Sequence, residues 1–216
     1  MRTELEEITK TVSFLSEAHD DQVNINKENS KVISNVVAEN NTLRTKLGEI
    51  TAELAEIEQR SRDSNIELQC VPESKSENLF THIKKLAGTV SYQLSDKDVL
   101  NCHRVAKYKS GSKRPRSIII KMISPRVRDN FLAAVKLYNL KNKDNKLNST
   151  HLGFAVNQPI YVMEHLSPVN KQLHTRIVAK EKNYEFVWIH NGKIFVHKNI
   201  KSEAKIVRDK DFLQNL

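Results

Sequence analysis

The sequence has little of what disulfide-rich or low-complexity proteins are made from. Only Cys70 and Cys102 occur among its 216 residues, and neither belongs to a Cys-x-x-Cys pair or a Cys/His cluster with zinc spacing. Both cysteines fall in stretches with strand character, so we expect small, buried, reduced thiols. Glycine and proline, at five residues each, are too scarce for a disordered low-complexity chain.

Long apolar runs and enzymatic motifs are absent as well. No run approaches the ~20 apolar residues of a membrane span, and the opening MRTELEEITK lacks the apolar centre of a signal peptide. The sequence contains no P-loop, no Gly-x-Ser-x-Gly elbow, no paired-carboxylate motif and no metal-ligand spacing. We therefore expect an intracellular protein of the cytoplasm or nucleus that is not an enzyme and has no cofactor or metal.

Charge is abundant and unevenly distributed. The formal net charge is +9. Residues 1–60 contain 7 Lys and Arg against 12 Asp and Glu, whereas residues 61–216 contain 28 against 14. A basic part behind an acidic part indicates a polyanionic partner for the basic part. The alternative is that the charge serves only solubility.

Residues 5–57 keep a single heptad register. Eleven of the sixteen a and d positions are apolar, and a lone amphipathic helix has no core of its own, so its apolar seam must meet another copy. The pattern predicts a parallel coiled coil over residues 1–60 that forms a homodimer or homotrimer. The apolar seam residues are Leu5, Ile8, Val12, Leu15, Ile33, Val36, Leu43, Leu47, Ile50, Leu54 and Ile57.

The middle of this seam is polar. His19, Gln22, Asn26 and Asn29 occupy four successive a and d positions. Either the coiled coil opens locally here, or a loop folds the segment into a hairpin of two helices. Asparagine at a positions fixes the register and favours dimers.

After Arg60 the apolar period changes from seven to two, which predicts an α+β protein. The order strand, helix, two strands, helix, strand is that of a split βαββαβ unit, the RNA-recognition-like (ferredoxin-like) arrangement. Ser76 and Ser124 are the expected N-caps, the second followed by Pro125. The expected strands are 65–71, 99–106, 117–123 and 160–166, the helices begin at 77 and 125, and residues 139–150 form a loop.

A small α/β domain is expected to follow. A helix begins at Ser167-Pro168, and Asn191-Gly192 between two alternating runs predicts a hairpin with a type I′ turn. That turn places Trp188 opposite Phe195 and Ile189 opposite Ile194. A third strand over 204–207 and a terminal helical turn over 211–216 complete the domain. The expected domains are therefore 1–60, 61–166 and 167–216.

The hairpin has an aliphatic side and an aromatic side. The aliphatic side chains are Val187, Ile189, Ile194 and Val196, and the aromatic side carries Tyr184, Phe186, Trp188, Phe195 and His197. If the aliphatic side packs under the helix, Trp188 and Phe195 with Lys193 form a stacking platform for a single nucleic-acid strand. In the other alternative the aromatic side chains are core.

The central strands 65–71 and 117–123 contain no aromatic residue, which argues against base stacking on that sheet. Phosphate contact by lysine and arginine remains, and it gives salt-sensitive, sequence-tolerant affinity. The loop KYKSGSKRPR is either a mobile basic arm or a solvated hairpin tip. The candidate phosphate-binding residues are Arg60, Arg62, Arg104, Lys107, Lys109, Lys113, Arg114, Arg116, Lys121, Arg126, Arg128, Lys171, Arg176 and Lys193.

Several phrases resemble those of known families. They are Arg60-Ser61-Arg62, Asn65-Ile66-Glu67-Leu68, Val71-Pro72-Glu73, Cys102-His103-Arg104-Val105, Arg114-Pro115-Arg116-Ser117-Ile118-Ile119-Ile120-Lys121, Ile160-Tyr161-Val162 and the Trp188–Val196 hairpin. Over roughly its last three quarters the chain resembles the few-polyhedra (FP) proteins of baculoviruses and insects. It also resembles the related first-open-reading-frame proteins of LINE-type non-LTR retrotransposons. The resemblance to the retrotransposon proteins implies nucleic-acid binding and self-association.

Two hypotheses follow. The first is a homo-oligomeric, non-catalytic protein that binds single-stranded RNA or DNA, in which the coiled coil joins several weak basic modules. The second, implied by the resemblance to baculovirus FP proteins, is a protein–protein scaffold in virion assembly or envelope-protein traffic, with viral or host proteins as partners. Steep salt dependence of nucleic-acid binding favours the first, and nuclease-resistant protein complexes favour the second.

Overall fold

We describe the protein from a computed structural model, in which residues 2–106, 111, 114–179, 184–199 and 203–207 are described. The chain divides into two compact units, Met1–Leu54 and Ala55–Leu216. The expected helical turn over 211–216 lies outside the described residues. The α+β class expected from the sequence is confirmed.

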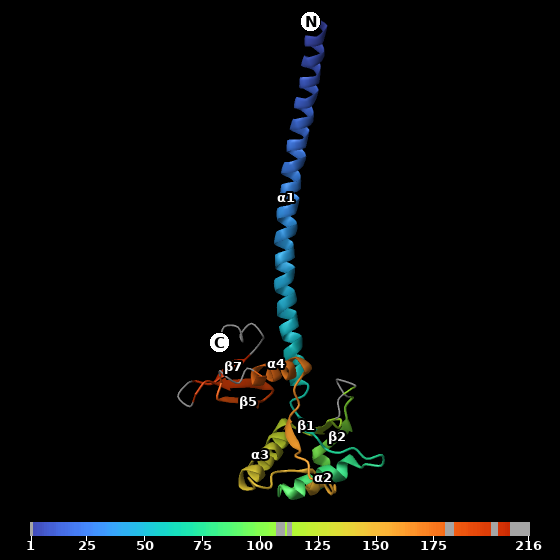
Figure 1. Ribbon diagram of the computed structural model, residues 1–216, viewed down its shortest axis with the longest axis vertical. Helices are drawn as coiled ribbons and strands as arrows, with labels where there is room; N and C mark the ends of the chain where they lie inside the picture. The colour runs from blue at the N-terminus through green and yellow to red at the C-terminus, as the bar shows by residue number, and fades with distance from the viewer. Residues whose placement is uncertain (1, 107–110, 112–113, 180–183, 200–202, 208–216) are drawn as a thin grey trace. The chain divides into compact units, whose positions relative to one another are not determined.

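The first unit is one helix, α1, which spans Arg2–Arg60 and so extends into the second unit (Figure 1). It continues without a break through residues 19–29, so the hairpin alternative is wrong. Threonine hydroxyls donate back to carbonyls one turn earlier at Thr9, Thr42 and Thr51. All eleven apolar seam side chains are exposed in the single chain, as expected of a helix whose apolar stripe has no partner within its own chain.

The central part has the expected βαββαβ order. The strands are β1 (Asn65–Gln69), β2 (Val99–Arg104), β3 (Ile118–Met122) and β4 (Tyr161–Glu164), and the helices are α2 (Leu79–Thr89) and α3 (Pro125–Lys141). The sheet order is β2-β3-β1-β4, and every neighbouring pair is antiparallel. Short 3₁₀ turns, η1 (Asp96–Asp98) and η2 (Ser149–Leu152), interrupt the connections.

The core of this part lies on one side of the sheet. Alternate residues of β1 and β3, such as Leu68 and Ile120, are fully buried there with Ile83 of α2 and Phe131 of α3, so both helices cover the same sheet face. The period of two in the strands explains this sorting, because it sends alternate side chains to opposite faces.

Of the two predicted N-caps, Ser124 of α3 is confirmed and Ser76 of α2 is wrong. Ser124 accepts from the Val127 amide, and Pro125 occupies the first turn of α3, as expected. The cap of α2 is Asn78 and not Ser76, because the Asn78 side chain accepts from the Thr81 amide. The expected loop over 139–150 is shorter than predicted, because α3 continues to Lys141 and η2 begins at Ser149.

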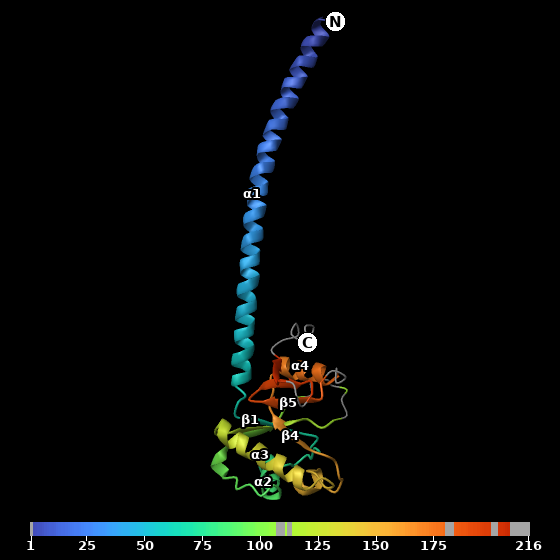
Figure 2. The same cartoon turned by 90° about the vertical axis from the view of Figure 1, so that its left-hand side faces the viewer.

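The last part contains α4 (Pro168–Ala179) and a three-stranded antiparallel sheet in the order β5-β6-β7 (Figures 1 and 2). The strands are β5 (Phe186–His190), β6 (Lys193–His197) and β7 (Lys205–Val207). Leu173 and Ile177 of α4 pack against Ile194 and Val196. The predicted hairpin register is confirmed, since Trp188 pairs with Phe195 and Ile189 with Ile194.

Two expectations about single features can also be compared with the structure. Cys70 and Cys102 are free thiols, and both are half-buried where the sequence suggested buried thiols. Burial raises the pKa of the Cys102 thiol.

Among the helices that the structure describes, none is long and apolar enough to cross a bilayer.

Candidate nucleic-acid interface

The Asn191-Gly192 turn determines which side chains share a face of the C-terminal sheet. Asn191 has φ 50° and Gly192 has φ 69°. A type I′ turn requires positive φ at both central residues, and Asn and Gly are the residues that tolerate it best. The turn aligns β5 with β6 so that Phe186 pairs with His197 and His190 with Lys193. Every second residue therefore faces the same way on both strands.

The side away from α4 carries an aromatic face, which we define as Phe186, Trp188, His190, Lys193, Phe195 and His197. The Trp188 and Phe195 rings stack with centroids 5.4 Å apart and planes 12° apart. The His197 ring meets Trp188 edge-on at 6.3 Å. Trp188 is 37% exposed and Phe186 is 44% exposed, so this face is presented to solvent.

The aromatic side chains are exposed because the other side of the same hairpin supplies the core. Ile194 and Val196 are buried against α4 together with Val207. This is the arrangement that the stacking alternative required, and the alternative in which the aromatic side chains of the strands are core is wrong. Tyr184 is the exception, because it is buried in that core and burial raises the pKa of its hydroxyl.

An exposed aromatic pair beside a cation matches the chemistry of single-strand recognition. Bases stack on aromatic rings whatever their sequence, and a lysine at the same surface can contact the backbone phosphates. Lys193 is exposed and lies opposite His190 at the end of the aromatic face. The face therefore combines a stacking surface with a positive charge.

The tip of the hairpin is bound to the central sheet. The Glu164 carboxylate at the end of β4 accepts from the backbone amides of Asn191 and Gly192, at 3.1 and 2.7 Å. The guanidinium of Arg128 lies 3.5 Å from the same carboxylate and donates to the Asn191 side chain. The aromatic face is thus attached to a fixed point on the rest of the unit.

Arg104 and Arg128 are buried in intramolecular ion pairs. Arg104 donates to both carboxylate oxygens of Glu77 and to backbone carbonyls of Val71 and Pro72. These hydrogen bonds from Arg104 lower the pKa of Glu77. The Arg128 side chain is 2% exposed and contacts Glu164. Neither guanidinium is presented to a phosphate in this structure.

Four other candidates also have carboxylate partners: two pairs lie at the surface, the Arg62 pair is partly buried, and the partner of Lys171 is the buried Glu67. Arg60 pairs with Glu56 within α1, Arg62 in the turn after α1 pairs with Glu58, and Arg116 pairs with Glu73. The backbone amide of Arg116 also donates to Glu73 and is the largest cause of the lowered pKa of that carboxyl. Lys171 donates to Glu67 at 2.7 and 2.9 Å. The exposed pairs of Arg60 with Glu56 and of Arg116 with Glu73 contribute at most about 1 kcal/mol to stability.

The remaining candidates divide between the surface and the residues that are not described. Arg114, Lys121, Arg126 and Lys193 are exposed. Lys107, Lys109, Lys113 and the side chain of Arg176 lie outside the described residues. The candidate residues are spread over many elements of the chain. Three of them, Trp188, Phe195 and Lys193, lie together on one face of the C-terminal sheet.

The face of the central sheet opposite its helices offers less to a base. Glu67 in β1 and its partner Ile119 in β3 point to that side, and both are buried. Lys171 of α4 covers Glu67. Burial disfavours the Glu67 carboxylate, but the hydrogen bond and charge of Lys171 outweigh burial and lower its pKa. Tyr161, on the edge strand β4, is exposed.

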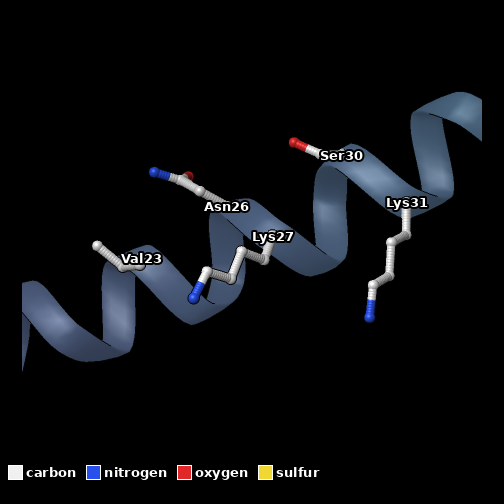
Figure 3. A pocket seen from close by; sticks show the side chains of 5 residues that line it. All are labelled: Val23, Asn26, Lys27, Ser30 and Lys31. Atoms are coloured by element: carbon white, nitrogen blue, oxygen red, sulfur yellow. The ribbon is translucent and has the colours of Figure 1, made fainter.

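No group of three or more potential metal-ligating side chains occurs among the described residues. A shallow groove lies on α1, lined by Val23, Asn26, Lys27, Ser30 and Lys31 (Figure 3). Figure 3 shows these side chains projecting from neighbouring turns of one helix. Because one helix supplies the whole lining, the groove is the surface between its own side chains.

His190 was not predicted as a member of the aromatic face, nor were Glu164 and Gln59 as residues that hold the hairpin and α4 in place. Strict alternation from Trp188 would have identified His190, because residues two apart share a face. Glu164 and Gln59 carry no such signal, because their partners Gly192 and Ser167 are distant in sequence.

A known family model matches the end of the chain. Residues 167–216 match the family model described as Baculovirus FP protein domain 2. This range contains α4 and the whole aromatic face. No curated protein gives a significant match to the chain.

Proposed function

We propose that this chain is a non-catalytic, homo-oligomeric protein that binds single-stranded nucleic acid in a sequence-tolerant way, with bases stacking on its aromatic face. The match of residues 167–216 supports placing it with the FP proteins. Its kinship with retrotransposon first-open-reading-frame proteins, and the RNA-recognition-like character of residues 61–166, belong to the same proposal. We place its action in the cytoplasm or nucleus.

The observation that carries the proposal is the exposed stack of Trp188 on Phe195, with Lys193 on the same face. Large aromatic side chains exposed together on a folded surface mark an interaction site. Residues 61–216 contain 28 Lys and Arg against 14 Asp and Glu. This excess of positive charge favours a polyanionic partner over a neutral or positively charged one.

Self-association strengthens weak individual sites. The eleven exposed apolar seam residues of α1 can be buried by further copies of the helix. Linking several binding faces raises the overall affinity by about 10²–10⁴ when the geometry permits simultaneous contact. The acidic coiled coil itself is a poor phosphate ligand, so binding falls to residues 61–216.

The chain carries its own reporter, because Trp188 is its single tryptophan. Stacking of a base on this indole should quench its fluorescence. We would titrate the full-length protein with a single-stranded RNA, the matching single-stranded DNA and the duplex, across a salt series. Quenching by single strands that weakens steeply with salt supports the proposal. Absence of binding at low salt contradicts it.

Variants then locate the site. Trp188→Ala with Phe195→Ala should weaken binding, measured by anisotropy of a labelled strand, by roughly 5- to 150-fold per stacked base. Tyr161→Ala is the matched control, because Tyr161 is an exposed aromatic residue on the other sheet. Val36→Asp with Leu43→Asp should disrupt the seam and remove the avidity while leaving quenching at high strand concentration.

A further inference from the structure

The outer edge of the C-terminal sheet carries a row of rings from a single strand. In the sheet order β5-β6-β7, β5 is an edge strand, and no other strand among the described residues pairs with its outer side. Phe186, Trp188 and His190 alternate along β5 on the aromatic face. All three are exposed, whereas Val187 and Ile189 between them are half-buried. The edge of the sheet therefore presents three accessible rings in succession.

The rings of the neighbouring strand β6 are less accessible. Phe195 pairs with Trp188 of β5 on one side and with Ile206 of β7 on the other, so it lies between two strands. Phe195 and His197 are both half-buried. A ligand approaching the aromatic face thus meets the rings of β5 more fully than those of β6.

Each ring of β5 rests against a ring of β6. The ring centroids of Phe186 and His197 are 6.2 Å apart, and those of Trp188 and Phe195 are 5.4 Å apart. His190 contacts Phe195 with centroids 6.5 Å apart. These contacts hold the β5 rings in place and occupy one side of each. The other side of each ring, towards the outer edge of the sheet, can receive one base by stacking.

The spacing of the three rings determines how a strand can use them. Side chains two residues apart on one β-strand are separated by about 6.8 Å, which is twice the rise per residue. Consecutive bases of a stacked strand are only about 3.4 Å apart. Three consecutive bases can therefore occupy the three rings only if the strand is extended and its bases are separated from one another. A duplex, whose bases remain paired and stacked, cannot make these contacts.

We propose that the outer row of β5 binds three consecutive nucleotides of an extended single strand, with one base on each of Phe186, Trp188 and His190. The rings of β6 support the row from behind. Lys193 lies opposite His190 at one end of the row and can neutralise a phosphate there. The inference rests on the proposed function and adds the number of nucleotides, their path along β5 and their extended conformation.

Strands with abasic positions test the number of nucleotides on the unsubstituted full-length chain. Each probe is a labelled nonamer in which one, two, three or four adjacent thymidines lie between abasic deoxyribose spacers. All probes have the same number of phosphates, so differences in affinity, measured by anisotropy, report the bases alone. We expect the affinity to rise by roughly 5- to 150-fold with each base up to three, and by no more than about twofold with the fourth.

A probe with three thymidines at every second position tests the extended conformation. In a strand that kept the stacked rise, alternate bases would match the spacing of the rings, and this probe would bind at least as tightly as three adjacent thymidines. In an extended strand alternate bases reach only the first and last rings of the row. We therefore expect the alternating probe to bind at least roughly 5-fold more weakly than three adjacent thymidines.

Single substitutions assign bases to individual rings. With Phe186→Ala or with His190→Ala, the affinity should stop rising at two adjacent thymidines. His103→Ala is the matched control for His190→Ala, because His103 is an exposed histidine on strand β2 of the other sheet. This control should keep the limit at three thymidines. Circular dichroism melting would confirm that each variant is folded.

The outcomes separate this inference from the proposed function. An affinity that does not depend on the number of bases, or that keeps rising well beyond three, overturns the three-nucleotide row and leaves nucleic-acid binding intact. An alternating probe that binds as tightly as three adjacent thymidines overturns the extended conformation. If every probe and a long natural single strand fail to bind at low salt, the proposed function is contradicted, and this inference with it.

Discussion

The guanidinium of Arg104 binds both carboxylate oxygens of Glu77, with Nε–Oε1 and Nη2–Oε2 distances of 2.5 and 2.6 Å. Arg104 lies at the end of β2 and Glu77 just before α2. The same guanidinium donates to the carbonyls of Val71 and Pro72. Arg104 thereby joins the ends of three segments of the central part.

Arg104→Ala should therefore reduce stability and not phosphate affinity. Removing one partner of a buried ion pair costs about 3–5 kcal/mol, because the other charge stays buried without compensation. Urea unfolding followed by Trp188 fluorescence would measure the loss. Arg116→Ala is the control, since its pair with Glu73 is at the surface and should cost at most about 1 kcal/mol. Equal losses for the two variants would contradict a structural role for Arg104.

This pair shows what the sequence could predict and what it could not. The heptads of α1, the strand order and the Trp188–Phe195 pairing were predictable, because each is encoded in a local period or turn. Whether a basic side chain meets a phosphate or a carboxylate depends on residues distant in sequence. Arg104 meets Glu77, and Arg128 meets Glu164. Composition cannot reveal such partners, so the sequence nominated both arginines as ligands.

The composition of the aromatic face was predictable from the sequence, but its exposure to solvent was not. Alternation in the hairpin separates an aliphatic side from an aromatic side, but it does not say which side α4 covers. Leu173 and Ile177 of α4 pack on Ile194 and Val196. Branched aliphatic side chains fill the narrow space between helix and sheet, and the larger rings remain on the open side.

Gly192→Ala should destabilise the protein for two separable reasons. Gly192 has φ 69°, where a residue with a Cβ loses about 1–3 kcal/mol. The new Cβ would also lie 2.6 Å from the Gln59 side chain. In a Gln59→Ala background the second reason disappears, so the substitution should cost less. A double-mutant cycle by urea unfolding measures the difference, and purely additive losses would contradict the packing of Gln59 on the turn.

Acidification should weaken the fold through His165. Burial is the largest cause that lowers the pKa of His165 to about 4 from 6.5, and the charges of Arg62 and Lys171 act in the same direction. Between these two values the unfolded chain binds more protons than the folded chain. The free energy of unfolding should therefore fall as the pH drops from 6.5 towards 4.

His165→Gln isolates this contribution. His82 and His174 also have pKa values lowered by burial, so part of the pH dependence should remain in the variant. Urea unfolding at several pH values would compare the two chains. The slope of stability against pH should be shallower for His165→Gln, and an unchanged slope would show that His165 titrates alike in the folded and unfolded chains.

The salt dependence of binding distinguishes a phosphate ligand from a structural cation. For single strands the logarithm of the affinity falls against the logarithm of salt concentration by about 0.7 for each phosphate neutralised. Lys193→Ala should therefore reduce the slope by about 0.7. Lys97→Ala, an exposed lysine of η1, is the matched control and should leave it unchanged. Anisotropy titrations of a labelled single strand would measure both.

This measurement separates charge from stacking at the same face. Trp188→Ala should lower the affinity at every salt concentration and keep the slope, because stacking releases no counterions. Lys193→Ala should instead reduce the salt slope, so that its loss of affinity becomes smaller as the salt concentration rises. If both variants changed the slope equally, the aromatic face would be acting through a general change in the sheet. The distinct contributions of the ring pair and the lysine would then be disproved.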